Sequence, residues 1–174
     1  VSDAFLKTLA SQLERTIRQS LQNGTFEEDF KDFWDRASGK YTTLTEQAIL
    51  ADEAAVARAE AAKEVNEVNQ LISDGADELT ALAKTTNDAW DAMDGGYGAG
   101  ATIEEMDAYE TALAAYDAAE ATFTDKLNND YIPRIDAGTD VYNDATAAYE
   151  AAATLYQETY DDISGGDEDF ESGY

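Results

Sequence analysis

The sequence predicts an all-α protein: an elongated antiparallel helical hairpin, packed like a coiled coil, with two shorter helices before it. Apolar or small residues recur in steps of three and four along most of the 174 residues, which is the periodicity of helices with one packed face. A glycine-rich stretch, residues 95–100, marks a reversal of the chain. Three Thr-x-x-Glu patterns precede such periodic runs and predict helix N-termini.

The first helix is expected from about Ser2 to Gln22. Its apolar side chains recur every four residues and form one face: Phe5, Leu9, Leu13, Ile17 and Leu21. Asn23 and Gly24 follow, and both residue types tolerate the left-handed backbone conformation in which many helices end.

A second, short helix is expected from Thr25, which pairs with Glu28 in a capping box, to about Ser38, with Gly39 ending it. It carries a dense aromatic cluster: Phe26, Phe30, Phe33 and Trp34. The cluster has two interpretations, packing against the chain's own long helices or anchoring a partner protein, because aromatics on short amphipathic helices fill grooves. Residues 1–39 are therefore predicted to form an N-terminal docking segment.

The first arm of the hairpin is expected from about Thr43, which pairs with Glu46 in a second capping box, to Asp94. Along it runs the predicted seam, the line of positions that packs against the other arm, in which alanine predominates and allows close approach of the helix axes. Its apolar members include Leu44, Ala48, Ala55, Ala62, Val65, Ile72 and Leu79, and its polar members are Arg58, Asn69 and Thr86. Residues 73–75, Ser-Asp-Gly, are expected to kink or interrupt the arm.

The second arm is expected to begin after Thr102, which pairs with Glu105 in a third capping box, and to end near Ile163. Pro133 has no amide hydrogen and restricts the residue before it, so Ile132 is expected to leave helical geometry and the arm to kink there.

The predicted seam continues on this second arm. Its members are Leu113, Tyr116, Phe123, Ala145, Tyr149, Ala152, Leu155 and Tyr156. The apolar face is wider than a two-stranded coiled coil needs, so the N-terminal helices or a second copy of the chain should cover it. Residues 40–163 are thus predicted to form the hairpin, with its turn at 95–101, and residues 164–174 an acidic tail.

The amino-acid composition indicates the salt conditions in which the chain is expected to fold. The chain has 38 acidic and 11 basic residues, a net charge of −27, and neither histidine nor cysteine. Residues 85–174 alone carry 22 acidic and 2 basic residues. Repulsion of this size is screened only where the Debye length is short, about 3 Å in molar salt, so the sequence favours a halophilic source.

The missing residue types exclude several chemistries. Without cysteine there are no disulfides, thiolate metal sites or cysteine nucleophiles, and without histidine there is no imidazole base or ordinary transition-metal ligand set. No catalytic, cofactor-binding or metal-ligating residues are predicted, although loosely bound cations are compatible with so acidic a surface. No basic patch suggests nucleic-acid binding, and no apolar run of 18 residues suggests a membrane span.

These features predict a non-catalytic structural or assembly subunit of a larger complex, such as a virion (capsid, tail or connector) or a surface appendage. Its partners would be proteins, either further copies of itself or other subunits, bound through apolar helical faces. The alternative is a soluble acidic adaptor or decoy that binds a basic protein. The compartment stays open: a virion or extracellular assembly is suspected, and a cytoplasmic location is compatible with the same sequence.

Overall fold

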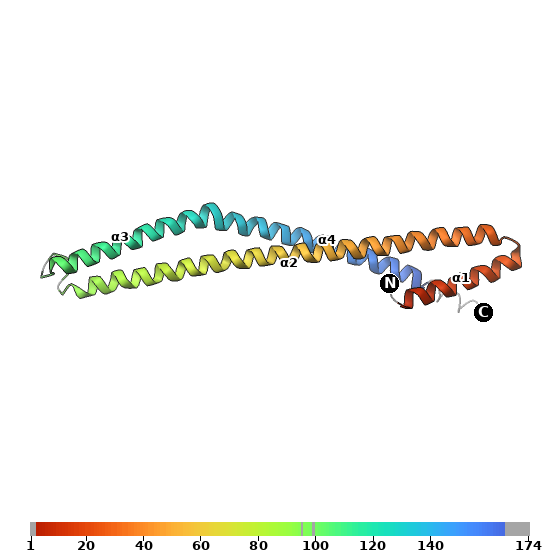
Figure 1. Ribbon diagram of the computed structural model, residues 1–174, viewed down its shortest axis with the longest axis horizontal. Helices are drawn as coiled ribbons and strands as arrows, with labels where there is room; N and C mark the ends of the chain where they lie inside the picture. The colour runs from red at the N-terminus through yellow and green to blue at the C-terminus, as the bar shows by residue number, and fades with distance from the viewer. Residues whose placement is uncertain (1–2, 95, 99, 166–174) are drawn as a thin grey trace. The chain divides into compact units, whose positions relative to one another are not determined.

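The computed structural model describes residues 3–94, 96–98 and 100–165, and these confirm the all-α prediction. The α-helices are α1 (Asp3–Asn23), α2 (Phe26–Ala92), α3 (Ile103–Lys126) and α4 (Ile132–Gly165) (Figure 1). A π-helical turn, Leu127–Tyr131, joins α3 to α4. The predicted tail, residues 164–174, lies outside the described residues from residue 166 onward.

Contacts divide the chain into two compact units, which are described separately. Unit 1 consists of Val1–Arg58 and Asn143–Tyr174, so it holds α1, the first part of α2 and the last part of α4. Unit 2 consists of Ala59–Tyr142 and holds the rest of α2, all of α3, the π-helical turn and the first part of α4.

In unit 1, α1 ends at Asn23 and Gly24, as predicted. Gly24 has φ +70°, the left-handed conformation that glycine adopts without strain. The Thr25 amide then donates to the Ser20 carbonyl at 3.0 Å, the bond that characterises a Schellman C-cap. Ser20 is fully buried, and its hydroxyl donates to the Thr16 carbonyl at 2.5 Å. The chain therefore reverses compactly into α2.

The expected second short helix is wrong, because α2 continues through Gly39 without a break. A single glycine costs a helix only about 1 kcal/mol, whereas burying a large apolar side chain stabilises by about 2 kcal/mol. Phe33 and Leu44, on either side of Gly39, are both buried. Thr43, predicted to cap a new helix, lies inside α2 and donates its hydroxyl to the Gly39 carbonyl at 3.0 Å. Residues 73–75 do not interrupt α2 either.

In unit 2, the predicted glycine turn and the capping box after it are confirmed. Gly96, Gly98 and Gly100 have φ between +85° and +89°, a region strained for any other residue. The Thr102 hydroxyl oxygen accepts from the Glu105 amide at 3.1 Å, and the Thr102 amide donates to Glu105 Oε2 at 2.9 Å. The chain thus turns and starts α3, which runs back along α2.

Pro133 distorts the second arm, but Ile132 does not leave helical geometry as expected. Ile132 has φ −61° and ψ −49°, and its amide donates to the Leu127 carbonyl, five residues earlier. In an unbroken α-helix the ring of Pro133 would press on the carbonyl four residues before it. The π-helical turn directly upstream holds one extra residue and relieves that conflict. The distortion therefore falls on residues 127–131.

Glycines set the packing of the helices in unit 2. A Cβ atom added to Gly75 would overlap Cε2 of Phe123, so the phenyl ring occupies the space that a side chain on α2 would need. A Cβ atom on Gly138 would lie 2.8 Å from Cγ2 of Val65. The two arms of unit 2 can therefore pack this closely only with glycine at these positions.

One cross-helix ion pair accompanies this packing. Arg134 on α4 contacts Oε1 of Glu64 on α2 through Nε at 2.8 Å and Nη2 at 2.7 Å. The hydrogen bond with Glu64 raises the pKa of the Arg134 guanidinium further above its ordinary value. Asp130, in the π-helical turn, lies 3.7 Å from the same guanidinium. The pair thus joins the distorted turn to α2 within unit 2.

The buried positions of α2 follow the predicted spacing in a different register. The least exposed small or apolar residues in its middle part recur every seven residues: Ala54, Ala61 and Val68. The sequence predicts the neighbouring positions Ala55, Ala62 and Asn69, of which Ala55 and Ala62 are half-buried and Asn69 is exposed. The packed stripe on α2 is therefore displaced by one residue from the predicted seam over this stretch.

Candidate functional site

Two features of unit 1 stand out as candidate interaction surfaces. The first is an aromatic ladder on α2, formed by Phe26, Phe30 and Trp34. The rings of Phe26 and Phe30 stack with centroids 5.7 Å apart, and those of Phe30 and Trp34 stack at 6.4 Å. Phe26 is 38% exposed and Trp34 is 54% exposed. The spacing of four residues aligns the rings along one side of the helix.

The predicted aromatic cluster therefore divides into two. Phe33 points to the interior of unit 1 and is only 6% exposed, which fits the interpretation that it packs against the chain's own helices. Phe26 and Trp34 are exposed, and Phe30 between them is half-buried. Trp34 lies about 100° around the helix from Phe33, which explains why these two neighbours differ in exposure. Phe26 lies within about 20° of Phe33 but two turns earlier, at the first residue of α2.

The second feature is a groove of about 410 Å³, called here the basic groove. Three helices line it: α1 through Leu9, Gln12, Arg15, Thr16 and Gln19, α2 through Phe33, Arg36, Ala37 and Lys40, and α4 through Asp162 and Ile163. Three cations face a single carboxylate among these residues, in a chain of net charge −27. Its apolar part is formed by Leu9, Phe33, Ala37 and Ile163.

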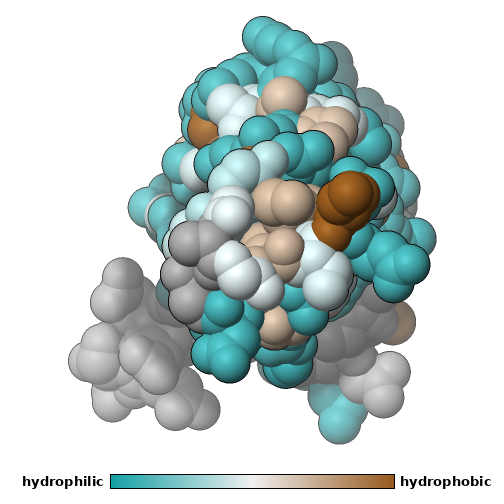
Figure 2. Space-filling model, turned by 90° about the vertical axis from the view of Figure 1, so that its left-hand side faces the viewer, coloured by the Kyte–Doolittle hydropathy of each residue, from teal (hydrophilic) through white to brown (hydrophobic). Residues whose placement is uncertain are grey.

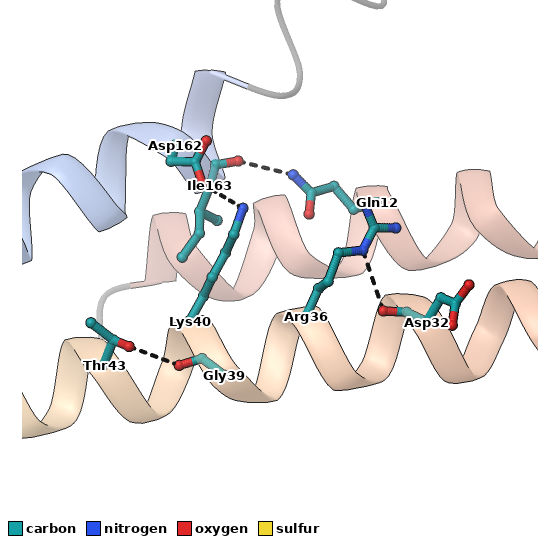
Figure 3. Close-up of polar contacts among 8 residues, drawn as sticks. All are labelled: Gln12, Asp32, Arg36, Gly39, Lys40, Thr43, Asp162 and Ile163. Carbon is teal, nitrogen blue, oxygen red and sulfur yellow. Dashed lines mark hydrogen bonds and ion pairs between the residues drawn. The ribbon is translucent and has the colours of Figure 1, made fainter.

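Polar contacts hold the end of α4 against the groove (Figure 3). The Gln12 side-chain amide donates to the Ile163 carbonyl at 2.9 Å. Lys40 Nζ lies 2.7 Å from Oδ2 of Asp162. This ammonium group holds the pKa of the Asp162 carboxyl below its ordinary value, mainly through the hydrogen bond. The last turn of α4 is thus fixed to both α1 and α2.

Arg36 lies next along α2 from Lys40, on the same side of the helix (Figure 3). Its Nε donates to the Asp32 carbonyl at 3.3 Å, which uses one of the five N–H donors of the guanidinium. Leu44 and Ile163 form a small buried cluster with Leu9, Tyr156 and Tyr160 around it. Leu9 and Ile163 also line the groove, so the apolar cluster adjoins its cationic residues.

The predicted seam residues differ in exposure. Leu44, Ala145 and Ala152 are buried. The half-buried members are Ala55, Ala62, Val65, Ile72, Leu79, Leu113, Tyr116, Phe123 and Tyr156, and the exposed ones are Ala48, Tyr149 and Leu155. Arg58 lies over the Tyr149 ring with its guanidinium carbon 5.1 Å from the centroid, so this predicted polar seam position makes a cation–π contact.

Sequence reasoning missed the basic groove, although a signal was present. Phe33, Arg36, Ala37 and Lys40 are spaced by three and four residues, which places them on one face of a continuous helix. The predicted helix end at Gly39 separated Lys40 from the other three. Once α2 is continuous, the two cations flank the apolar residues on its inward side.

The end of unit 2 that carries the turn presents both polar and apolar surface. Figure 2 views this end, where pale, tan and brown residues gather over the middle of the face and hydrophilic residues surround them. Ile103, in the first turn of α3, is 73% exposed, and Tyr97 in the turn is also exposed. The Tyr97 hydroxyl donates to Glu110, and this hydrogen bond raises the pKa of the tyrosine.

No family model, curated protein or solved structure compared with this chain matches it. Within residues 3–94, 96–98 and 100–165, none of the helices has both the length and the apolar character required to cross a membrane. The same residues contain no group of three or more carboxylates placed to hold a metal ion.

Proposed function

We propose that this chain is a non-catalytic structural or assembly subunit that associates with protein partners, further copies of itself included, in concentrated salt. The observation that carries the proposal is the aromatic ladder. Each Å² of exposed apolar surface that a partner covers contributes about 25 cal/mol to the free energy of association. Aromatic residues at the centre of a contact surface contribute most to protein association.

The surroundings of the ladder support a role in docking. Tyr41 continues the exposed apolar surface on α2, and Ile49, Leu50 and Val56 are exposed further along the same helix. The basic residues of unit 1 reduce its repulsion of an acidic partner, because 7 of the 11 Lys and Arg residues lie within its boundaries. Unit 1 is therefore the better surface for contact between two strongly acidic chains.

Native mass spectrometry and light scattering in about 2 M salt test the proposal. We expect the wild-type chain to self-associate and the Phe30→Ala/Trp34→Ala double variant to need an at least tenfold higher concentration, roughly the effect of losing interface aromatics. Leu71→Ala/Ile103→Ala is the matched control, since it removes two exposed large apolar side chains from unit 2. A strictly monomeric wild-type chain over the whole concentration range would contradict self-association.

Circular dichroism during a salt titration tests the proposed setting. We expect helicity and the melting temperature to rise with salt, because the Debye length shortens from about 10 Å at 0.1 M to about 3 Å at 1 M and screens the 38 carboxylates. Full helicity with cooperative melting in nearly ion-free water would show that the chain does not depend on concentrated salt.

A further inference from the structure

The basic groove continues beyond the point where α4 stops covering α1 and α2. Ile163 and Asp162 contact Gln12 and Lys40, respectively, at one end of the groove. From there the lining extends along α1 to Gln19 and along α2 back to Phe33. Unit 1 is thus a three-helix arrangement in which α4 reaches only one end of the groove. Among the described residues, the rest of the groove is lined by polar side chains of α1 and, on α2, by Phe33, Ala37 and the cations beside them.

We propose that the acidic segment that follows α4, residues 166–174, binds in the basic groove of its own chain. Its carboxylates are Asp167, Glu168, Asp169 and Glu171, and its aromatic residues are Phe170 and Tyr174. The carboxylates pair with the cations of the groove, and Phe170 packs against Ala37 and Phe33 on α2.

Charge complementarity is the first argument for this occupant. Arg15, Arg36 and Lys40 line the groove against one carboxylate, Asp162, so the described lining carries a net positive charge in a strongly acidic chain. The segment contains four acidic residues and no basic ones. Arginine binds carboxylates through a planar set of donors, which suits the guanidinium groups at the groove edge.

Reach is the second argument. The segment begins three residues after Ile163, which itself lines the groove. Nine extended residues span up to about 30 Å. The uncovered part of the groove between Gln12 and Gln19 corresponds to about 10 Å of helix, at about 1.5 Å per residue. A segment tethered this closely has an effective concentration in the millimolar range, which favours it over the same segment of a second copy.

The absence of cysteine allows a direct test with the full chain, because two introduced cysteines would be the only ones present. The probe pair is Ala37→Cys with Ser172→Cys, in which Ala37 lines the groove and Ser172 lies in the segment without contributing charge or an aromatic ring. The control pair is Ser38→Cys with Ser172→Cys, since Ser38 is exposed on a different side of α2. The measurement is the rate of disulfide formation under mild oxidation, with non-reducing gels to separate monomer from dimer.

We expect the A37C/S172C variant to form an intrachain disulfide about tenfold faster than the S38C/S172C variant, as a local difference in effective concentration predicts. Adding Arg36→Glu should remove most of this advantage. Lys31→Glu, the same charge change at an exposed position on α2 outside the groove, should leave it. Circular dichroism on each variant checks that helicity is retained.

Equal intrachain rates for the two cysteine pairs would overturn the proposal. Faster formation of an interchain disulfide by the A37C/S172C variant would also overturn it, because the occupant would then be the segment of a second copy. An advantage that survives Arg36→Glu would show that charge does not select the segment. These outcomes are independent of whether the aromatic ladder mediates assembly, which the mass measurements on Phe30 and Trp34 decide separately.

Discussion

Within each unit the helices pack against one another, but the side chains at the contacts differ between the two units. In unit 1, large side chains from three helices meet: Leu44 and Ile163 form the buried cluster, and Leu9, Tyr156 and Tyr160 pack around it. In unit 2, the arms approach through glycine and alanine, with Gly75 against Phe123 and Gly138 against Val65. Both kinds of helix packing occur in one alanine-rich, acidic chain.

The comparison shows what each kind of packing allows. Contacts between large side chains leave irregular space between helices, and the basic groove is such a space. Close packing at glycine fixes the register of unit 2, because any other residue at Gly75 meets the ring of Phe123. An open hollow of about 360 Å³ lies beside this contact and is lined by both residues. We therefore propose unit 1 as the unit that binds partners and expect unit 2 to hold its two arms in register.

The largest expected effect tests the packing of unit 1. Leu44 is 7% exposed at the centre of the cluster, so Leu44→Ala should destabilise the chain by about 2–5 kcal/mol through lost burial and a cavity. Urea unfolding in concentrated salt, followed by circular dichroism, measures the change. Leu50→Ala is the control on the same helix, since Leu50 is 49% exposed and its loss should cost about 0.5 kcal/mol or less. Similar costs for the two variants would mean that unit 1 has no specific core.

The second prediction tests the packing of unit 2 by the same substitution at two glycines of α2. Gly39→Ala should stabilise by about 0.5–1 kcal/mol, because alanine favours helices and nothing lies within 4 Å of the new Cβ atom. Gly75→Ala should destabilise by about 1–3 kcal/mol through overpacking against Phe123. Urea unfolding measures both changes.

A third variant isolates the cause of that difference. In a Phe123→Ala background the obstructing ring is absent, so Gly75→Ala should become stabilising, as Gly39→Ala is. If both glycines respond alike in the wild-type background, unit 2 is not held by close glycine packing, and the contrast between the units disappears.

Much of the fold could be predicted from local rules. The ends of α1 at Gly24 and of α2 before the glycine turn, and the capping box of Thr102 and Glu105, depend on backbone conformations and hydrogen bonds within a few residues. The helix break expected at Gly39 does not occur, because tertiary contacts outweigh the local helix-breaking preference of glycine. Phe33 and Leu44 bury against other helices, which no local pattern records.

The register of α2 and the groove depend on longer-range geometry. Adjacent alanines at positions 54–55 and 61–62 make two registers equally apolar, and only the partner helices select Ala54 and Ala61. The predicted docking cluster includes Phe33 for the same reason, since its spacing alone does not say which side of α2 faces inward. The groove requires α1, α2 and the end of α4 together, and these come from opposite ends of the sequence.

The smallest expected effect concerns the ion pair that fixes the end of α4 in unit 1. Lys40 lowers the pKa of Asp162 in the folded chain, so this contact stabilises the fold at neutral pH, and its contribution is lost as the pH falls below about 4 and the carboxylate is protonated. A double-mutant cycle of Lys40→Met and Asp162→Asn, with thermal melts from pH 7 to pH 3, measures the coupling between the two residues.

The cycle is needed because protonation of 38 carboxylates also relieves repulsion across the whole chain, and that larger effect cancels in the coupling. The coupling should be small and reduced by salt, since both side chains are more than one-third exposed. We expect a favourable coupling at pH 7 that weakens as the pH falls through the lowered pKa of Asp162. A coupling that is absent at pH 7, or that grows as the pH falls, would show that Lys40 does not hold α4 in place, and the apolar contacts of Leu44 with Ile163 would then account for the packing of unit 1 alone.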